Sequence, residues 1–338
     1  MTDGTETGPA DTMRKRSGVS RIKLWVLLRA NRLLVSGVLA SAVFVAFVIA
    51  AAVLDPSLSE GIESGDTIDT MFSTMITVIV TGTTLVVTIG QLVLSQENGP
   101  LGDQRERMAS SMDFRDFTEE LTGSPSPADP SEFLRRIIGA AAHRTTALRE
   151  SVSKNENANL REEVDEFAES VTENADSVRD QLEGAQFGSF DVVSAALNFN
   201  YSWKISNVER LANEYEGSLS AEEHDAFDDL KTALTLFAPA REHVKTLYFQ
   251  WALINLSQMI LYAAVPALVV AGIMVAIVDV GTFPGSTLGF DHLTLVVGAA
   301  FAVTLVPFML FVSYLLRILT VAKRTLAIEP LILRESRR

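Results

Sequence analysis

The sequence predicts an all-α membrane protein with four transmembrane helices and a cytoplasmic helical bundle inserted between the second and third. Three observations predict this fold class. Four apolar runs are each long enough to cross a bilayer. The stretch 101–247, between the second and third runs, is highly charged and keeps helical spacing of its apolar residues. Lys and Arg gather before the first run and after the fourth, and neither loop on the opposite side contains a cation.

The amino-acid composition of the chain argues against several classes of function. The 338 residues include 42 Asp and Glu but only 28 Lys and Arg, which gives a net charge of -14. Such an excess of carboxylates indicates a hydrated surface suited to concentrated salt. It weighs against nucleic acid as a partner, because no basic stripe exists to replace the counterions. The absence of cysteine excludes disulfides, thiolate catalysis and cysteine-based metal centres.

The N-terminal part contains a tail and the first span. Residues 1–20 are polar and predicted to be disordered. The membrane segment 21–100 begins with a short interfacial helix, Arg21 to Arg32, whose arginines we expect at the lipid headgroups. The first span, 33–54, is rich in small residues that favour close helix packing.

The second span carries the most informative pattern in the chain. Between Thr70 and Ser95 it has no charge, and its polar residues step alternately by four and three. That spacing places them on one face of a helix. These eight residues are Thr70, Thr74, Thr77, Thr81, Thr84, Thr88, Gln91 and Ser95. The opposite side, which we expect to face lipid, holds Met75, Ile79, Val86, Ile89 and Val93.

Two interpretations of this stripe remain open. In the first, several copies surround an axis and the hydroxyl groups line a narrow aqueous path for ions. In the second, the stripe is a seam for packing against another helix. Glu63, Asp66 and Asp69 lie just before the stripe and would form an outer acidic mouth that attracts cations.

The cytoplasmic helical domain is predicted over 101–247. Asp129 and Ser220 are expected to cap helices, each with a glutamate three residues later. Two helices joined by a short polar turn predict an antiparallel hairpin over 130–182. The pattern from Phe190 to Tyr215 predicts one helix, and Pro239 is expected to kink the helix that leads to the membrane.

The last spans are predicted within 248–322, the third over 251–278 and the fourth over 292–316. Asn255 and Gln258 are candidate inner polar contacts, with amides that would bond to a neighbouring helix, for example at Gln91. The final stretch, 323–338, is predicted to be a basic cytoplasmic tail.

The sequence contains no motif that indicates a catalytic, metal-binding or cofactor-binding site. His143, His224, His243 and His292 have no zinc-binding spacing with a suitable third ligand, so neither metal nor cofactor is expected. Phosphate-binding loops and nucleophile motifs are missing, which argues against an enzyme. No charged residue lies within the four spans, which argues against active transport.

The run GTTLVVTIGQLVLSQENGPLGDQRERM, Gly82 to Met108, resembles a segment of uncharacterised multi-pass membrane proteins of haloarchaea. It covers under a tenth of the chain and implies origin and membrane location, with no activity. The layout also resembles bestrophin-type channels in topology, with a second helix at the pore. It departs from them in lacking their sequence motifs and in having threonines where an apolar neck would be expected.

We therefore expect a passive channel-like homo-oligomer in the cell membrane, with the second span lining the path and both termini cytoplasmic. The alternative is a non-conducting membrane sensor or scaffold whose cytoplasmic helices bind a protein partner. A membrane-bound enzyme without a recognisable motif is a third reading. Expected partners are membrane lipids and further copies of the chain.

Overall fold

The computed structural model describes residues 21–53, 66–97, 99–186, 188–279, 281–287 and 289–325. The chain divides into two compact units. An apolar unit contains Trp25–Asn98 and Gln250–Val321, and a polar unit is built mainly from Gly99–Phe249. The expected tail 1–20, Glu63, and nearly all of 323–338 lie outside the described residues.

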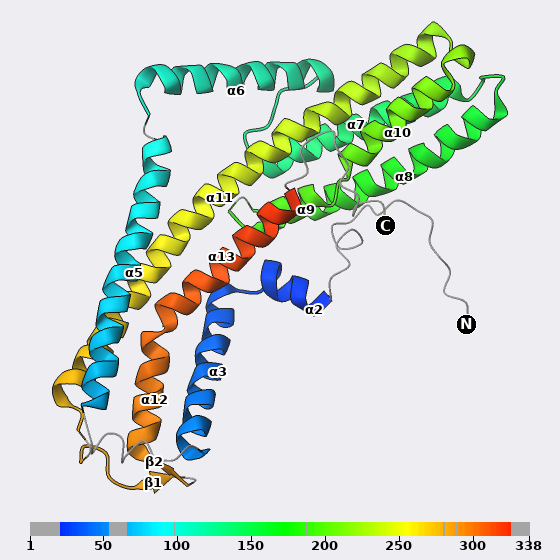
Figure 1. The fold of residues 1–338 in the computed structure, drawn as a ribbon. Helices are drawn as coiled ribbons and strands as arrows, with labels where there is room; N and C mark the ends of the chain where they lie inside the picture. Colours follow the sequence, from blue (N-terminus) through cyan, green and yellow to red (C-terminus); the bar gives the residue numbers. More distant parts are fainter. Residues whose placement is uncertain are drawn as a thin grey trace, which may run out of the picture. The chain divides into compact units, whose positions relative to one another are not determined.

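The apolar unit is built from helices (Figure 1). Its elements are the short helix η1 (Trp25–Arg29), which follows α2 (Arg21–Leu24), then α3 (Arg32–Val53), α5 (Thr67–Glu97), the second part of α11 (Ala221–Ile277), α12 (His292–Thr304) and α13 (Val306–Thr325). A two-stranded hairpin of β1 (Ser286–Thr287) and β2 (Phe290–Asp291) precedes α12, with Thr287 opposite Phe290. His292 ties this hairpin together, because its ring nitrogens bond Thr287 Oγ1 at 2.7 Å and the Pro284 carbonyl at 3.0 Å.

Three helices in the described residues are long and apolar enough to cross a membrane: α3, α5 and α11. The pair α12 and α13 makes a fourth if it is one span, but it bends by 43°. The sequence predicts one span over 292–316, with Pro307 inside it. The break at Leu305 comes just before Pro307, which has no N–H to donate and whose ring clashes with the preceding turn.

The helices of the apolar unit pack through several clusters of apolar side chains. Phe72 of α5 meets Ala271 and Met274 of α11 together with Leu293 and Val297 of α12. Helix α12 also approaches α3 closely, since a Cβ added at Gly298 would lie 2.9 Å from Phe47 Cδ1. A larger residue at this glycine would therefore require the ring to move.

The polar unit is a bundle of α6 (Leu101–Thr122), α7 (Pro130–Val152), α8 (Ala158–Leu182), α9 (Phe190–Leu197), α10 (Tyr201–Glu214), the short η2 (Glu216–Ser218) and the first part of α11. Helices α7 and α8 form the expected hairpin, and they bury Leu134, Ile137, Leu160 and Val171 completely. Pro239 lies inside α11 without ending it.

The single helix expected from Phe190 to Tyr215 is wrong, because the chain forms α9 and α10 with a break at Asn198–Asn200. The break is stabilised by side-chain amides. Asn198 donates from Nδ2 to Gln181 Oε1 at 2.8 Å, and Asn174 donates to the Asn198 carbonyl at 3.0 Å. Asparagine competes in this way with helical backbone bonds.

Lys204 is fully buried in the polar unit, which the sequence analysis did not anticipate. Its Nζ donates to Asn174 Oδ1 at 2.8 Å and lies 4.8 Å from the centre of the Phe199 ring. Helical spacing could have revealed it, since Lys204 falls between Tyr201 and Val208 on the inward face. A buried charge of this kind requires acceptors and aromatic faces around it.

Both expected helix caps form. Asp129 accepts hydrogen bonds from the backbone nitrogens of Ser131 and Glu132, at the start of α7. At the start of α11, the Glu223 carboxylate accepts from Ser220 N at 2.7 Å, and Asn155 Nδ2 donates to both of its oxygens at 2.9 and 3.0 Å. Glu223 is only 6% exposed. The cap therefore ties α11 to the turn between α7 and α8.

Acid should weaken this cap. Burial raises the pKa of the Glu223 carboxyl, but hydrogen bonds from Ser220 and Asn155 outweigh it, so the pKa lies below its usual 4.5. Stability from this group is present above pH 4.5 and is lost as the pH falls through the lowered value. We expect Asn155→Ala to cost about 1–2 kcal/mol at pH 7 and less at pH 3. Chemical unfolding of the full chain at several pH values measures this.

Asn157→Ala is the matched control, because Asn157 caps α8 in the same turn without contacting Glu223. Its cost of about 1 kcal/mol should stay constant across the same pH range. Equal pH dependence in the two variants would contradict the role given to Glu223.

Candidate functional site: the polar stripe of helix α5

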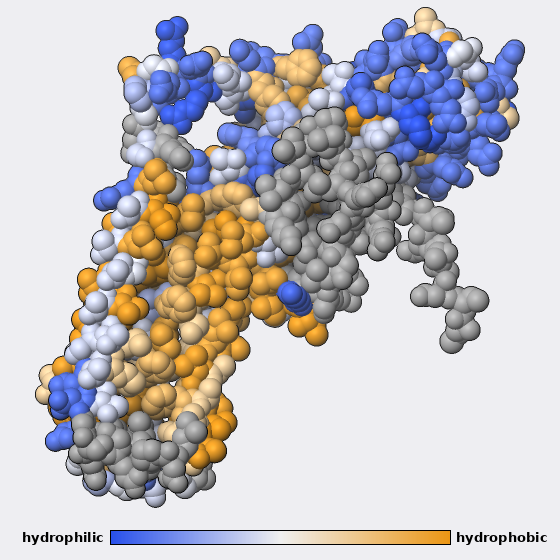
Figure 2. Space-filling model, viewed as in Figure 1, coloured by the Kyte–Doolittle hydropathy of each residue, from blue (hydrophilic) through white to orange (hydrophobic). Residues whose placement is uncertain are grey.

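The eight polar residues identified in the second span lie on one outward face of α5, and all eight are exposed in the single chain. In Figure 2 they form a pale band along α5 beside the orange, apolar surface. Here the name polar stripe denotes these eight residues, from Thr70 to Ser95. No residue of the apolar unit that the structure describes covers them.

Five of the seven hydroxyl groups of the polar stripe bond to their own helix. Thr74 Oγ1 donates to the Thr70 carbonyl at 2.7 Å, and Thr84 Oγ1 donates to the Val80 carbonyl at 2.9 Å. Thr77, Thr88 and Ser95 do the same within the preceding turn. A threonine whose hydrogen is used in this way still has oxygen lone pairs to offer. The polar stripe therefore presents a row of hydrogen-bond acceptors away from the bundle.

The other side of α5 packs inward. Ile79 and Val86, which the sequence analysis assigned to lipid, are 5% exposed each. Ile79 meets Ala264 of α11, and Val86 meets Leu256 of α11. The expectation of a lipid-facing side at these two positions is wrong, because the apolar residues are needed to hold α5 against α11.

The two ends of the polar stripe differ in charge. Asp66, just before α5, and Asp69, in its first turn, are exposed at the helix start, where a carboxylate is favoured by the positive end of the helix dipole. Glu63, the third residue of the expected acidic mouth, lies outside the described residues. At the other end, the Gln91 side chain is exposed.

The two candidate inner amides have different surroundings. Asn255 donates from Nδ2 to Tyr314 Oη of α13 at 3.0 Å, so it links α11 to α13. Gln258 is exposed on α11. In the described residues, neither the Asn255 amide nor the Gln258 amide bonds to Gln91. Close to that level, a Cβ added at Gly90 would lie 3.4 Å from Ser257 Oγ, so α5 and α11 nearly touch there.

Arg32 was expected at the lipid headgroups, but it is 4% exposed. Its guanidinium donates to the carbonyls of Val26 at 2.7 Å, Ala30 at 2.6 Å and Ser313 at 3.1 Å. Arg317 donates to the same Ala30 carbonyl at 2.8 Å. These bonds join the end of η1 to α13. Sequence reasoning missed this role, because an arginine beside an apolar run is equally typical of a headgroup anchor.

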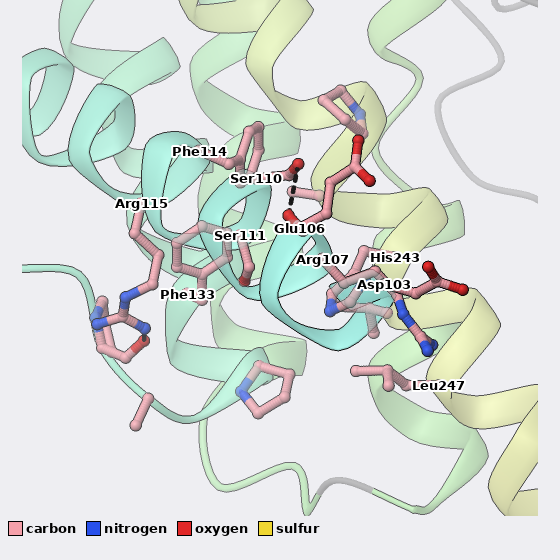
Figure 3. Close-up of a pocket in the computed structure, with 16 residues that line it drawn as sticks. Asp103, Glu106, Arg107, Ser110, Ser111, Phe114, Arg115, Phe133, His243 and Leu247 are labelled. Carbon is pink, nitrogen blue, oxygen red and sulfur yellow. Dashed lines mark hydrogen bonds between the residues drawn. The ribbon is translucent and has the colours of Figure 1, made fainter. Parts of the chain in front are cut away.

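The polar unit has a cavity of about 880 Å³ between α6, α7 and α11. Figure 3 shows Asp103, Arg107 and His243 near one end and Phe114 and Phe133 near the other. The two phenylalanine rings lie 5.9 Å apart. The mixture of charged and aromatic side chains favours no single ligand chemistry. Among the described residues, no group of three His, Asp or Glu could hold a metal ion.

Fold and stripe together define the class of the protein. It is a helical protein with three or four segments long and apolar enough for a membrane, one of them with a polar outward face. The chain belongs to a family of unknown function, DUF7972, which it matches over residues 1–338. Searches of curated proteins and of solved structures found no match.

Proposed function

We propose that this protein is a four-span membrane protein, not an enzyme, whose copies assemble around α5 and form a passive path for ions. In this proposal both termini and the polar unit are cytoplasmic, as the distribution of Lys and Arg indicates. The observation that carries it is the polar stripe, which is exposed in the single chain along the whole length of α5.

Assembly follows from the cost of leaving this surface in lipid. Hydrocarbon offers no hydrogen bonds to the oxygen lone pairs or to the Gln91 amide, so another helix or water is the better neighbour. The spacing of 3.5 residues suits helices that wrap around one another in a left-handed sense. Copies of α5 around an axis satisfy both requirements.

The chemistry of the stripe favours cations. Because Thr74, Thr77, Thr84 and Thr88 donate their hydroxyl hydrogens to the backbone, their oxygens can replace part of a cation's hydration shell. Asp66 and Asp69 at the first turn would raise the local cation concentration at one mouth. No charged side chain lies between Asp69 and Ser95, which fits passive flow better than coupled transport.

Single cysteines along α5 test the path directly, because the natural chain has none. A cysteine reacts as the thiolate, which forms in water and is suppressed in hydrocarbon. We expect substitutions at Thr74, Thr77 and Thr81 to react with water-soluble thiol reagents in lipid vesicles at least tenfold faster than the controls. The matched controls are the lipid-exposed Val38 of α3 and Val265 of α11, which are 67% and 65% exposed.

Planar-bilayer recording of the same protein supplies the functional readout. Currents that are carried by cations and blocked by modifying Thr81→Cys would support the proposal. Stripe cysteines as slow as the Val38 and Val265 controls, together with silent bilayers across voltage and salt, would overturn it.

A second candidate function is a sensor or scaffold that binds a protein through the polar unit. Helix α6 supports it, since Leu101, Met108 and Met112 share one face and are 82%, 62% and 42% exposed. Exposed apolar surface on a soluble helix often marks an interaction site. Silent bilayers with a protected stripe would favour this function.

The acidic composition and the resemblance of the Gly82–Met108 run also lead us to propose a haloarchaeal origin. A high salt concentration would then be needed for stability. This proposal is independent of the two functions above.

A further inference from the structure

The apolar unit contains a cavity of about 550 Å³, and two residues of the polar stripe, Thr77 and Thr81, are among those that line it. One wall is α5 between Met75 and Val86, and Ile260 of α11 contributes to it. The opposite wall is the bend between α12 and α13, from Thr304 to Phe311. The helix break at Leu305 lies within this wall. The cavity therefore lies beside the bend of the fourth span.

The walls are almost entirely carbon. Of the hydroxyls that line them, Thr77 donates to the Ser73 carbonyl at 3.1 Å and Thr304 donates to the Phe301 carbonyl at 2.8 Å. The Thr83 oxygen is itself buried and has no hydrogen-bond partner among the described residues. A bound water needs two to four polar partners, and apolar cavities of this kind stay dry. Water is thus a poor occupant.

The position of the cavity across the bilayer indicates that its occupant is hydrocarbon. At about 1.5 Å per residue, the cavity lies about 12 Å from the first residue of α5 and about 16 Å from its last. The hydrocarbon core of a bilayer is about 30 Å thick, so the cavity falls near its middle. Its rim is open to the surroundings, because Val78, Leu85 and Phe308 are 51%, 59% and 53% exposed.

The size of the cavity favours a lipid hydrocarbon chain over a protein helix as its occupant. A helix with its side chains is about 10–12 Å wide, so a few turns of one would need more than the 550 Å³ that the cavity offers. The volume lies within the range of about 300–1,000 Å³ that holds small ligands. We propose that the cavity binds one hydrocarbon chain of a membrane lipid. The chain enters from the side and fills the space that the bend at Leu305 leaves against α5.

The test uses the full protein in lipid nanodiscs that contain a phospholipid with a diazirine at the middle of one acyl chain. After irradiation, mass spectrometry locates the label. We expect residues 75–86 and 304–311 to carry at least five times the label of the lipid-exposed face of α3 around Val45, with competition by unlabelled lipid. Even labelling of all exposed apolar faces would overturn the proposal.

Three variants test the site further. Gly82 lines the cavity, and a Cβ added there has open space around it, so we expect Gly82→Phe to occupy part of the cavity and to reduce the label at least fivefold. Val265→Phe, on a lipid-exposed face of α11, is the control and should leave it unchanged. Thr83→Val should also leave the amount of label unchanged, because a hydrocarbon chain forms no hydrogen bond with the hydroxyl. Label that persists in Gly82→Phe, with unfolding unaltered, would contradict the proposal.

Labelling requires no current. A silent bilayer would therefore overturn the proposed conduction and leave the lipid site intact. Even labelling of all exposed apolar faces would overturn the lipid site and leave the proposed conduction intact.

Discussion

Arg32→Ala should lower the free energy of unfolding of the apolar unit by about 3–5 kcal/mol. The guanidinium supplies the carbonyls of Val26, Ala30 and Ser313 with donors in a region where side chains are buried. Without it, Val26 and Ser313 lose this donor, and a buried acceptor left without a partner costs about 1–3 kcal/mol. Thermal or denaturant unfolding in detergent micelles measures the change.

Arg32→Lys separates charge from geometry. Lysine keeps the charge but cannot hold several carbonyls with a planar fork, so we expect it to recover less than half of the loss. Lys23→Ala is the nearby control, since Lys23 is exposed, and it should change stability by less than about 0.5 kcal/mol. Full recovery in Arg32→Lys would show that only the charge matters.

Replacing Thr77, Thr81 and Thr84 together with valine should reduce the proposed ion current roughly tenfold to a hundredfold. Valine has the shape of threonine without the oxygen. A membrane hydroxyl bond is worth about 0.5–1 kcal/mol, and each 1.36 kcal/mol added to a barrier slows passage about tenfold. The current is measured in planar bilayers at several cation concentrations.

Unfolding of this triple variant should change little, because all three side chains are exposed in the single chain and Thr77 and Thr84 bond only to their own helix. The matched triple variant with serine keeps the hydroxyls and should retain most of the current. An unchanged current in the valine variant would remove the stripe from the path. An equal loss in the serine variant would point to shape as the cause.

Several features of the fold could be predicted from local sequence alone. The apolar runs gave α3, α5 and the membrane part of α11 within a few residues, because a helix long enough for a bilayer needs an uninterrupted run. The caps at Asp129 and Ser220 also follow from adjacent residues. In each case the deciding interactions lie within a few residues along the chain.

Other features depend on residues far apart in the sequence. The break at Asn198 is held by Gln181 and Asn174 of α8, and the inward position of Arg32 depends on Ser313. Apolar spacing cannot predict these, because it does not say which segments become neighbours. Lys204 lay within the pattern and was overlooked, since a charged residue is rarely expected on a buried face.

Helix α5 separates the two kinds of information most clearly. The order of residues along the chain places its polar residues on one face and its apolar residues on another, because both sets repeat at helical spacing. Which face turns inward depends on the packing of α5 against the other helices. Ile79 and Val86 pack against α11, because burying apolar area against another helix stabilises the bundle. The threonines on the opposite face are therefore exposed.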